Sequence, residues 1–200
     1  MKINTLPRFY KTSVFLALVL YCTIFSASAH TGHEHSLGFT SGFAHPWSGL
    51  DHMLAMFAVG LWAYQTGKKA VWIIPSSFIG LMSIGFLTGM NGHTLSITEP
   101  MILASVMVIG IALFTARKLP LALCSIIVGV FAFFHGYAHG NEMTTGTNSL
   151  LYASGFLTST FALHLAGIAT GILSGRLLHP LAMRYAGLAI AVTGLFLGFE

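Results

Sequence analysis

The chain has 200 residues, of which 55% are hydrophobic and only 7% are charged, and its mean hydropathy is +0.80. Soluble domains carry about 25% charged residues, so this composition excludes an ordinary water-soluble protein and predicts an integral membrane protein. The net charge of +4 is not gathered into a basic patch, and we expect no nucleic-acid partner.

Residues 1–29 have the pattern of a cleaved secretory signal peptide, which would make His30 the first residue of the mature chain. An uncleaved membrane anchor is the alternative, but the apolar stretch is shorter than the roughly 20 residues that a spanning helix needs. The pattern consists of a basic start, an apolar stretch and a small-residue cleavage site: Lys2, Arg8 and Lys11, residues 14–25, and Ala27-Ser28-Ala29.

Residues 30–42 are predicted to form a His-rich periplasmic segment before a transmembrane domain at 43–200. Short His-rich tracts bind metal ions, although nothing in this sequence fixes the tract in one geometry. We expect loose capture of ions by this segment, with a merely solvated tail as the alternative. The imidazoles concerned are His30, His33 and His35.

Six apolar segments follow, and as helices they are long enough to cross a hydrocarbon core of about 30 Å. The predicted fold is therefore all-α: a polytopic membrane protein with a six-transmembrane-helix bundle after the signal peptide. The approximate bounds of the segments are 44–64, 70–90, 99–116, 120–140, 149–174 and 179–199.

The basic residues of the mature chain fall at alternate connections between these segments. Such connections face the cytoplasm by the positive-inside rule. Both mature termini are therefore predicted to face the periplasm, with the protein in the bacterial inner membrane. The residues that indicate this orientation are Lys68, Lys69, Arg117, Lys118, Arg176 and Arg184.

Small residues recur at four-residue spacing, for example at Gly85 and Gly89, which predicts close packing between helices. Residues 43–48 also resemble residues 133–138. This similarity is compatible with a 3+3 inverted repeat, but six partly similar positions can arise by chance.

The first polar motif, residues 45–52, lies in the first predicted span. Because proline is best tolerated in the first turn of a helix, Pro46 predicts that His45 lies at the helix start. His52 would then lie on nearly the same face, about 10 Å deeper. Asp51 could bind a cation directly or orient an imidazole by accepting its second N–H, and Gly49 leaves room beside that face.

The second motif lies in the fourth predicted span. His135, His139 and Glu142 are spaced by four and three residues, which puts them on one stripe of a helix. Counted from the outer ends of the two spans, His52 and His135 reach similar depth. One shared site between the two spans is therefore geometrically allowed.

Imidazole nitrogen and carboxylate oxygen without thiolate suit Ni²⁺, Co²⁺ or Zn²⁺ and not Cu(I). Cys124 is the single thiol of the predicted mature chain, which leaves no disulfide framework. The alternative is that each histidine only bonds neighbouring helices, but buried ionisable groups grouped this densely favour function. Four methionines could add sulfur ligands, although packing explains them more simply: Met53, Met56, Met90 and Met143.

His164 stands alone in the fifth predicted span, in the inner half of the membrane. It could relay a cation toward the cytoplasm or form a helix–helix hydrogen bond, and the sequence leaves both open. His93 and His179 are expected to be ordinary loop and interfacial residues.

The two motifs resemble the signatures of the HupE/UreJ family of hydrogenase- and urease-associated nickel permeases. The first signature, His-Pro-x-x-Gly-x-Asp-His, is matched from His45 to His52, and the second, Phe-His-Gly-x-Ala-His-Gly-x-Glu, from Phe134 to Glu142. The resemblance implies import of Ni²⁺, or Co²⁺ in some members, to supply metalloenzyme maturation. It also implies metal-handling roles for His45, Asp51, His52, His135, His139 and Glu142.

One spacing separates the chain from the larger nickel/cobalt transporters. Those proteins place four residues between the histidine and Asp-His, whereas five separate His45 from Asp51 here, so their mechanism is not transferred. We expect a permease and not an enzyme, with the ion as transported substrate and no fixed cofactor. The alternative is an intramembrane Zn²⁺-dependent hydrolase that uses the same His/Asp cluster.

Overall fold

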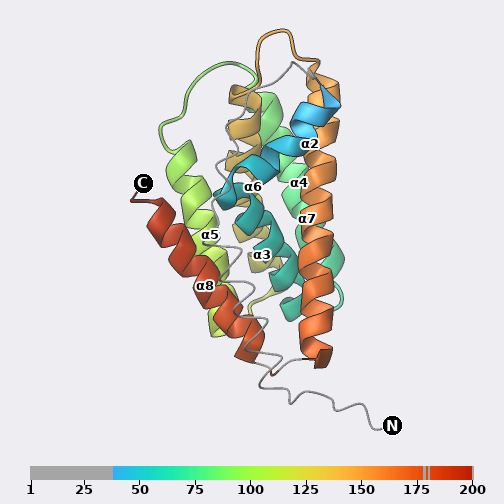
Figure 1. Cartoon of the computed structure of the whole chain (residues 1–200), viewed down its shortest axis with the longest axis vertical. Coiled ribbons are helices and arrows are strands. Elements are labelled where there is room, and N and C mark those ends of the chain that lie inside the picture. Colours follow the sequence, from blue (N-terminus) through green and yellow to red (C-terminus); the bar gives the residue numbers. More distant parts are fainter. Residues whose placement is uncertain (1–37, 178, 180, 200) are drawn as a thin grey trace, which may run out of the picture.

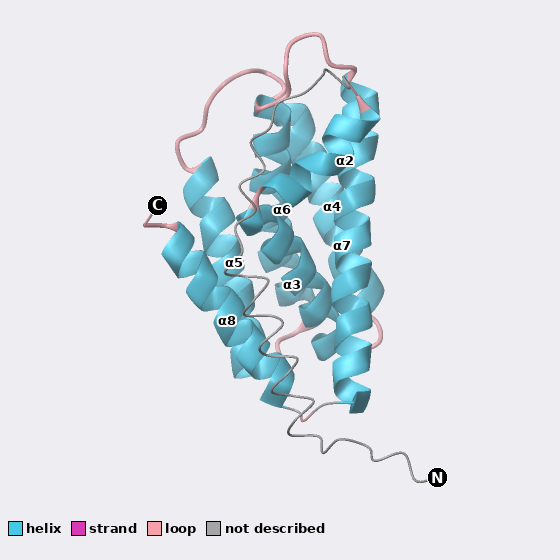
Figure 2. Ribbon diagram, viewed as in Figure 1, coloured by secondary structure: helices cyan, strands magenta, loops and turns pink. Residues whose placement is uncertain are grey.

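The computed structural model describes residues 38–177, 179 and 181–199, and all regular structure in that part of the chain is helical (Figure 2). The helices run side by side as an elongated bundle (Figure 1). Their bounds are α2 Phe39–Ser48, α3 Leu50–Thr66, α4 Ala70–Gly89, α5 Thr98–Thr115, α6 Leu121–Asn141, α7 Ser149–Leu177 and α8 Leu181–Leu197.

Four of the described helices, α4 to α7, are long and apolar enough to cross a membrane. α8 is apolar but shorter, with 17 residues. The all-helical membrane architecture is therefore confirmed, whereas the total of six spans and the inverted repeat stay predictions. The predicted signal peptide and the imidazoles of His30, His33 and His35 lie outside the described residues.

The prediction of one continuous helix over residues 44–64 is wrong. α2 already begins at Phe39, because Gly38 and Ser41 cap its start through a Gly38 N–H to Ser41 Oγ bond of 3.2 Å and a Ser41 hydroxyl to Gly38 carbonyl bond of 2.8 Å. Pro46 therefore lies inside α2 and His45 in its last turn, not at a helix start. The helix ends two residues after Pro46, and Gly49 is extended (φ −107°, ψ 122°) before α3 begins.

The helices pack in close pairs around α3, which contacts all six other described helices. α2 and α3 both lie along α7, α4 packs on α6, and α5 packs on α8 (Figure 1). The expected role of Gly85 in packing is confirmed, since a Cβ there would overlap the Phe133 carbonyl of α6. Gly136 of α6 in turn lies against the Met82 carbonyl of α4.

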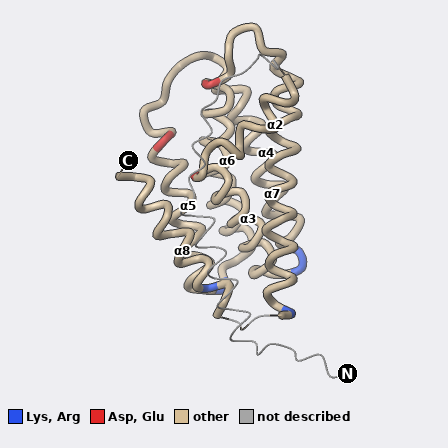
Figure 3. Tube along the Cα trace, viewed as in Figure 1, with Lys and Arg blue, Asp and Glu red and all other residues tan. Residues whose placement is uncertain are grey.

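Charge is divided between the two ends of the bundle. Among the described residues, Lys and Arg gather at the lower end in Figure 3, and no Asp or Glu shares that end. Lys68, Lys69, Arg117 and Lys118 lie in the connections that follow α3 and α5, whereas Arg176 and Arg184 lie in the adjoining ends of α7 and α8. The connections that follow α4 and α6 lie at the other end. The arrangement has the charge asymmetry that the positive-inside rule describes.

Candidate functional site

The break at Gly49 places the first turn of α3 against the buried imidazoles of the bundle. Asp51 Oδ1 accepts the His52 backbone N–H at 2.7 Å and lies 3.0 Å from His52 Nδ1. A carboxylate can only accept, so Nδ1 donates and Nε2 keeps a free lone pair. Asp51 thus orients an imidazole, and a Cβ at Gly49 would come within 2.6 Å of Asp51 Oδ1.

His135 of α6 is held in a similar way by a hydroxyl. Ser105 Oγ donates its single proton to the Ile102 carbonyl at 2.6 Å and lies 3.0 Å from His135 Nε2. The imidazole must therefore donate through Nε2, which leaves Nδ1 with a free lone pair. The His135 side chain is fully buried, and its Nδ1 has no hydrogen-bond partner among the described residues.

His45 and Glu142 form the more exposed edge of the cluster. His45 Nε2 lies 3.0 Å from Glu142 Oε2, and the two side chains are 27% and 43% exposed. This hydrogen bond lowers the pKa of Glu142 from its ordinary value, although partial burial of the carboxyl acts in the opposite direction. The bond ties the last turn of α2 to the C-terminal end of α6.

His139 lies between these two pairs. Its ring stacks on Phe156 of α7, with centroids 4.7 Å apart and planes at 6°, and meets the His45 ring edge-on at 4.7 Å. Its distance to the His52 ring is 5.2 Å. The side chain is fully buried, and neither ring nitrogen has a hydrogen-bond partner among the described residues.

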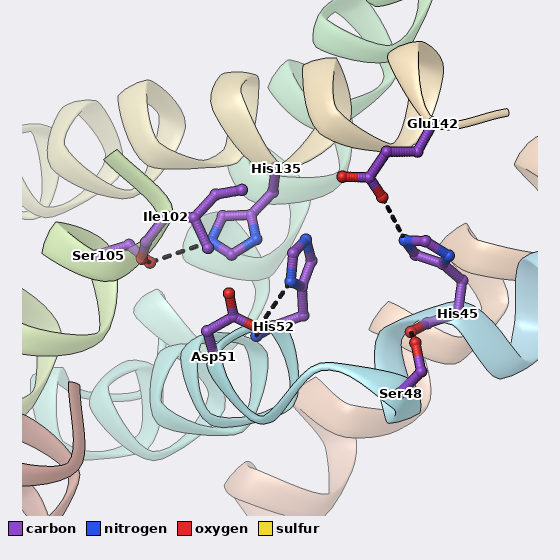
Figure 4. A network of polar contacts seen from close by, with 8 residues as sticks. All are labelled: His45, Ser48, Asp51, His52, Ile102, Ser105, His135 and Glu142. Atoms are coloured by element: carbon purple, nitrogen blue, oxygen red, sulfur yellow. Dashed lines mark hydrogen bonds and ion pairs between the residues drawn. The ribbon is translucent and has the colours of Figure 1, made fainter. Parts of the chain in front are cut away.

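The structure brings all six residues named in the two motifs into one cluster. The rings of His52 and His135 face one another with centroids 4.9 Å apart, and Figure 4 shows this pair beside the His45–Glu142 pair. The ring centroids of His45 and His52 are 6.1 Å apart across the break between α2 and α3. The cluster joins parts of the chain more than 80 residues apart in sequence.

The cluster is not a preformed coordination sphere. Within the described part of the chain, no group of three or more His, Cys, Asp or Glu side chains is arranged to hold a metal ion. The rings meet largely edge to face, at 64° for His52 and His139 and 89° for His52 and His135. A cation bound by three or more of these side chains would therefore require side-chain movement.

His164 is separate from this cluster. The Phe78 ring of α4 lies 5.7 Å from the His135 ring and 5.0 Å from the His164 ring, and so separates the two imidazoles. His164 is fully buried, and neither of its nitrogens has a hydrogen-bond partner among the described residues. The helix–helix hydrogen bond considered for its side chain is therefore not found there.

Sequence reasoning missed the residues that hold the imidazoles in place. Ser105 is a single hydroxyl in an apolar helix, and no local pattern links it to a histidine 30 residues later. Phe78 and Phe156 look like ordinary core residues. Phe156 and His164 are eight residues apart, about 80° around α7, so spacing did not link Phe156 to the cluster either.

Comparison with known proteins identifies the family of the chain. The family described as HupE / UreJ protein matches residues 17–197. The Protein HupE of Rhizobium leguminosarum bv. viciae is 40% identical over 187 residues, which cover 94% of this chain and 96% of that protein. No solved structure matches the chain. The resemblance drawn from the two motifs is thereby confirmed, and the chain belongs to the HupE/UreJ family.

Proposed function

We propose that this protein is an inner-membrane permease that imports a divalent transition-metal ion, Ni²⁺ first and Co²⁺ second, for metalloenzyme maturation. The observation that carries the proposal is the buried imidazole cluster, in which His52 and His135 are each held with one free nitrogen. An unpartnered buried polar group costs about 1–3 kcal/mol. Several such groups in an apolar bundle are explained if each free nitrogen binds the ion in turn as it passes.

The path begins at the acidic end of the bundle. We assign capture of dilute ions to His30, His33 and His35, and entry to His45, His139 and Glu142. A partly dehydrated ion then meets Asp51, His52 and His135, and His164 relays it toward the basic end. This order follows the decline in exposure from the His45–Glu142 pair to the fully buried His135 and His164.

The lack of a preformed coordination sphere suits transport better than storage. A site that bound the ion in ideal geometry would release it slowly, whereas imidazoles that must rotate to bind can also release. A divalent ion that moves inward gains about 4.6 kcal/mol per 100 mV of membrane potential. That gain offers a driving force without a nucleotide-binding motif.

We place both mature termini in the periplasm after removal of residues 1–29, with six spans in all. In this arrangement the discontinuous α2 and α3 together replace the first span, and α8 is the last. The separation of charge between the two ends of the bundle supports this orientation. The family assignment gives the zinc hydrolase alternative no support.

Accumulation of radioactive ⁶³Ni²⁺ by cells tests the proposal. His52→Ala and His135→Ala should each reduce uptake at least about tenfold with the amount of membrane protein unchanged, because each removes a buried ligand. His93→Ala is the matched control, since His93 lies in the exposed connection after α4. Unchanged uptake by both site variants would contradict the roles assigned to His52 and His135.

A further inference from the structure

A layer of two buried methionines lies at the level of His135 and below the outer imidazoles of the cluster. α3 and α7 both run toward the basic end, so Met56 lies one turn below His52, and Thr160 lies one turn below Phe156. α4 runs in the opposite direction, which puts Met82 one turn below Phe86, the ring that packs 5.0 Å from Phe156. Met56, Met82 and Thr160 are all fully buried.

The two thioethers of this layer converge on one hydroxyl. Thr160 Oγ1 donates to Met56 Sδ at 3.2 Å and lies 3.7 Å from Met82 Sδ. Several other helical hydroxyls of the bundle donate instead to a carbonyl one turn back in their own helix, as Thr158 does to Ser154 at 2.6 Å. The Thr160 hydroxyl is therefore directed across the bundle at sulfur, and both sulfurs lie at the centre of three helices.

The same helices supply the next layer toward the basic end. His164 lies one turn below Thr160 on α7, and Phe78 lies one turn below Met82 on α4. His135, one turn below His139 on α6, reaches the level of Met82, since its neighbour Gly136 abuts the Met82 carbonyl. The thioethers thus lie between the level of His52 and the level of His164.

We propose that Met56 and Met82 form a thioether station that passes the cation from the outer imidazoles to His164. This inference rests on the proposed import of a divalent ion. Thioether sulfur is a soft ligand, so such a station favours borderline and soft ions over Mg²⁺ or Mn²⁺, which prefer oxygen. The Thr160 hydroxyl donates its proton to Met56 Sδ, so the lone pairs of its oxygen stay free to bind an ion beside the two sulfurs.

Cadmium, a soft divalent ion, gives a direct readout when it is bound to the purified full-length chain. X-ray absorption at the cadmium edge distinguishes sulfur neighbours from nitrogen and oxygen. The test variant is Met56→Leu with Met82→Leu, because leucine keeps volume and apolar character while it removes sulfur. The matched control is Met183→Leu, a half-buried methionine of α8.

The wild type and M183L should show sulfur next to cadmium, and the double variant should show only nitrogen and oxygen with at least about tenfold weaker binding. Lack of sulfur in the wild type overturns the station. Sulfur that persists in the double variant also overturns it, because another sulfur, such as the thiol of Cys124, would then be the ligand. Failure of the proposed import would appear separately, as wild-type cells that accumulate no ⁶³Ni²⁺ whatever the cadmium spectrum shows.

Discussion

Two buried imidazoles of this protein are held in one tautomer by neighbours that can only accept a hydrogen bond from them. Asp51 accepts from His52 Nδ1, and Ser105 accepts from His135 Nε2 because its own proton is donated to the Ile102 carbonyl. Each ring in its neutral form therefore has one nitrogen with a free lone pair. The positions of the histidines can be predicted from the sequence, whereas their tautomers follow from contacts that form on folding.

Gly49 lies beside this arrangement, and Gly49→Ala tests its importance. The backbone angles of Gly49 are open to alanine, so the substitution adds no backbone strain. The added Cβ would lie 2.6 Å from Asp51 Oδ1 and 3.2 Å from His52 Nδ1, which forces the pair apart. We expect metal accumulation to fall about 10- to 100-fold, the usual cost of losing an orienting partner.

The control for that variant is Gly80→Ala, a helical glycine whose Cβ would meet nothing within 4 Å. Both variants should be compared for metal accumulation and for melting temperature in detergent. A Gly49→Ala protein that accumulates metal as the wild type does would show that the Asp51–His52 contact is dispensable.

The His45–Glu142 pair predicts a dependence of stability on pH. Because the pKa of Glu142 is lowered in the folded protein, the pair contributes its full stability above the ordinary value of 4.5, and the contribution is lost as the pH falls through the lowered pKa. Glu142 is 43% exposed, so the effect is at most about 1 kcal/mol.

Thermal unfolding of purified wild type and Glu142→Gln between pH 7 and pH 3 measures this contribution. The wild type should melt at a higher temperature at neutral pH, and the two curves should approach one another in acid. A difference that is constant over the whole range would assign the effect of the variant to packing and not to ionisation.

The bundle depends on close helix pairs, which predicts different effects of alanine at two glycines. Gly136→Ala would push a Cβ into the Met82 carbonyl of α4, so α4 and α6 must move apart. Overpacking of this kind costs about 1–3 kcal/mol. Gly136→Ala should therefore lower the melting temperature while Gly80→Ala, in open space on α4, does not. Equal melting temperatures of the two variants would show that close packing of α4 on α6 does not limit thermal stability.

The sequence predicted the regular helices well and the first span poorly. Continuous apolar runs gave bounds for the helices from α4 to α8 within a few residues, because hydrophobic length is what a membrane helix requires. The break at Gly49 carries no such signal: Pro46 is compatible with a helix start and with a helix interior near its end. The Gly38–Ser41 cap decided between these two readings, and it lies outside the motif.

The candidate site shows the same division. Helical spacing predicted that His135, His139 and Glu142 share one face and that His52 could reach His135, because these are properties of single helices. Ser105 and Phe78 reach the site only through tertiary packing of α5 and α4, which spacing along the chain does not encode. Four-residue spacing also could not show that Met56 and Met82 meet at Thr160.

For the whole molecule, the His-rich segment before α2 predicts a dependence on metal concentration. Deletion of residues 30–35 should weaken accumulation when metal is scarce, because loose capture raises the local ion concentration near the His45–Glu142 edge. At saturating metal the deletion should have no effect. A matched control replaces His30, His33 and His35 with asparagine at constant length, and an equal loss at all concentrations would contradict a capture role.

The imidazole cluster is proposed to carry a divalent ion through the bundle, and ion flux into liposomes measures this passage without other cell components. Purified protein is reconstituted around a Ni²⁺-quenched dye, and an inside-negative potential is imposed. The account predicts Ni²⁺ entry that increases with the potential for wild type and His93→Ala, and that falls to the protein-free rate for His52→Ala and His135→Ala. Wild-type entry no faster than that of protein-free liposomes, or equal entry through all four proteins, would contradict it.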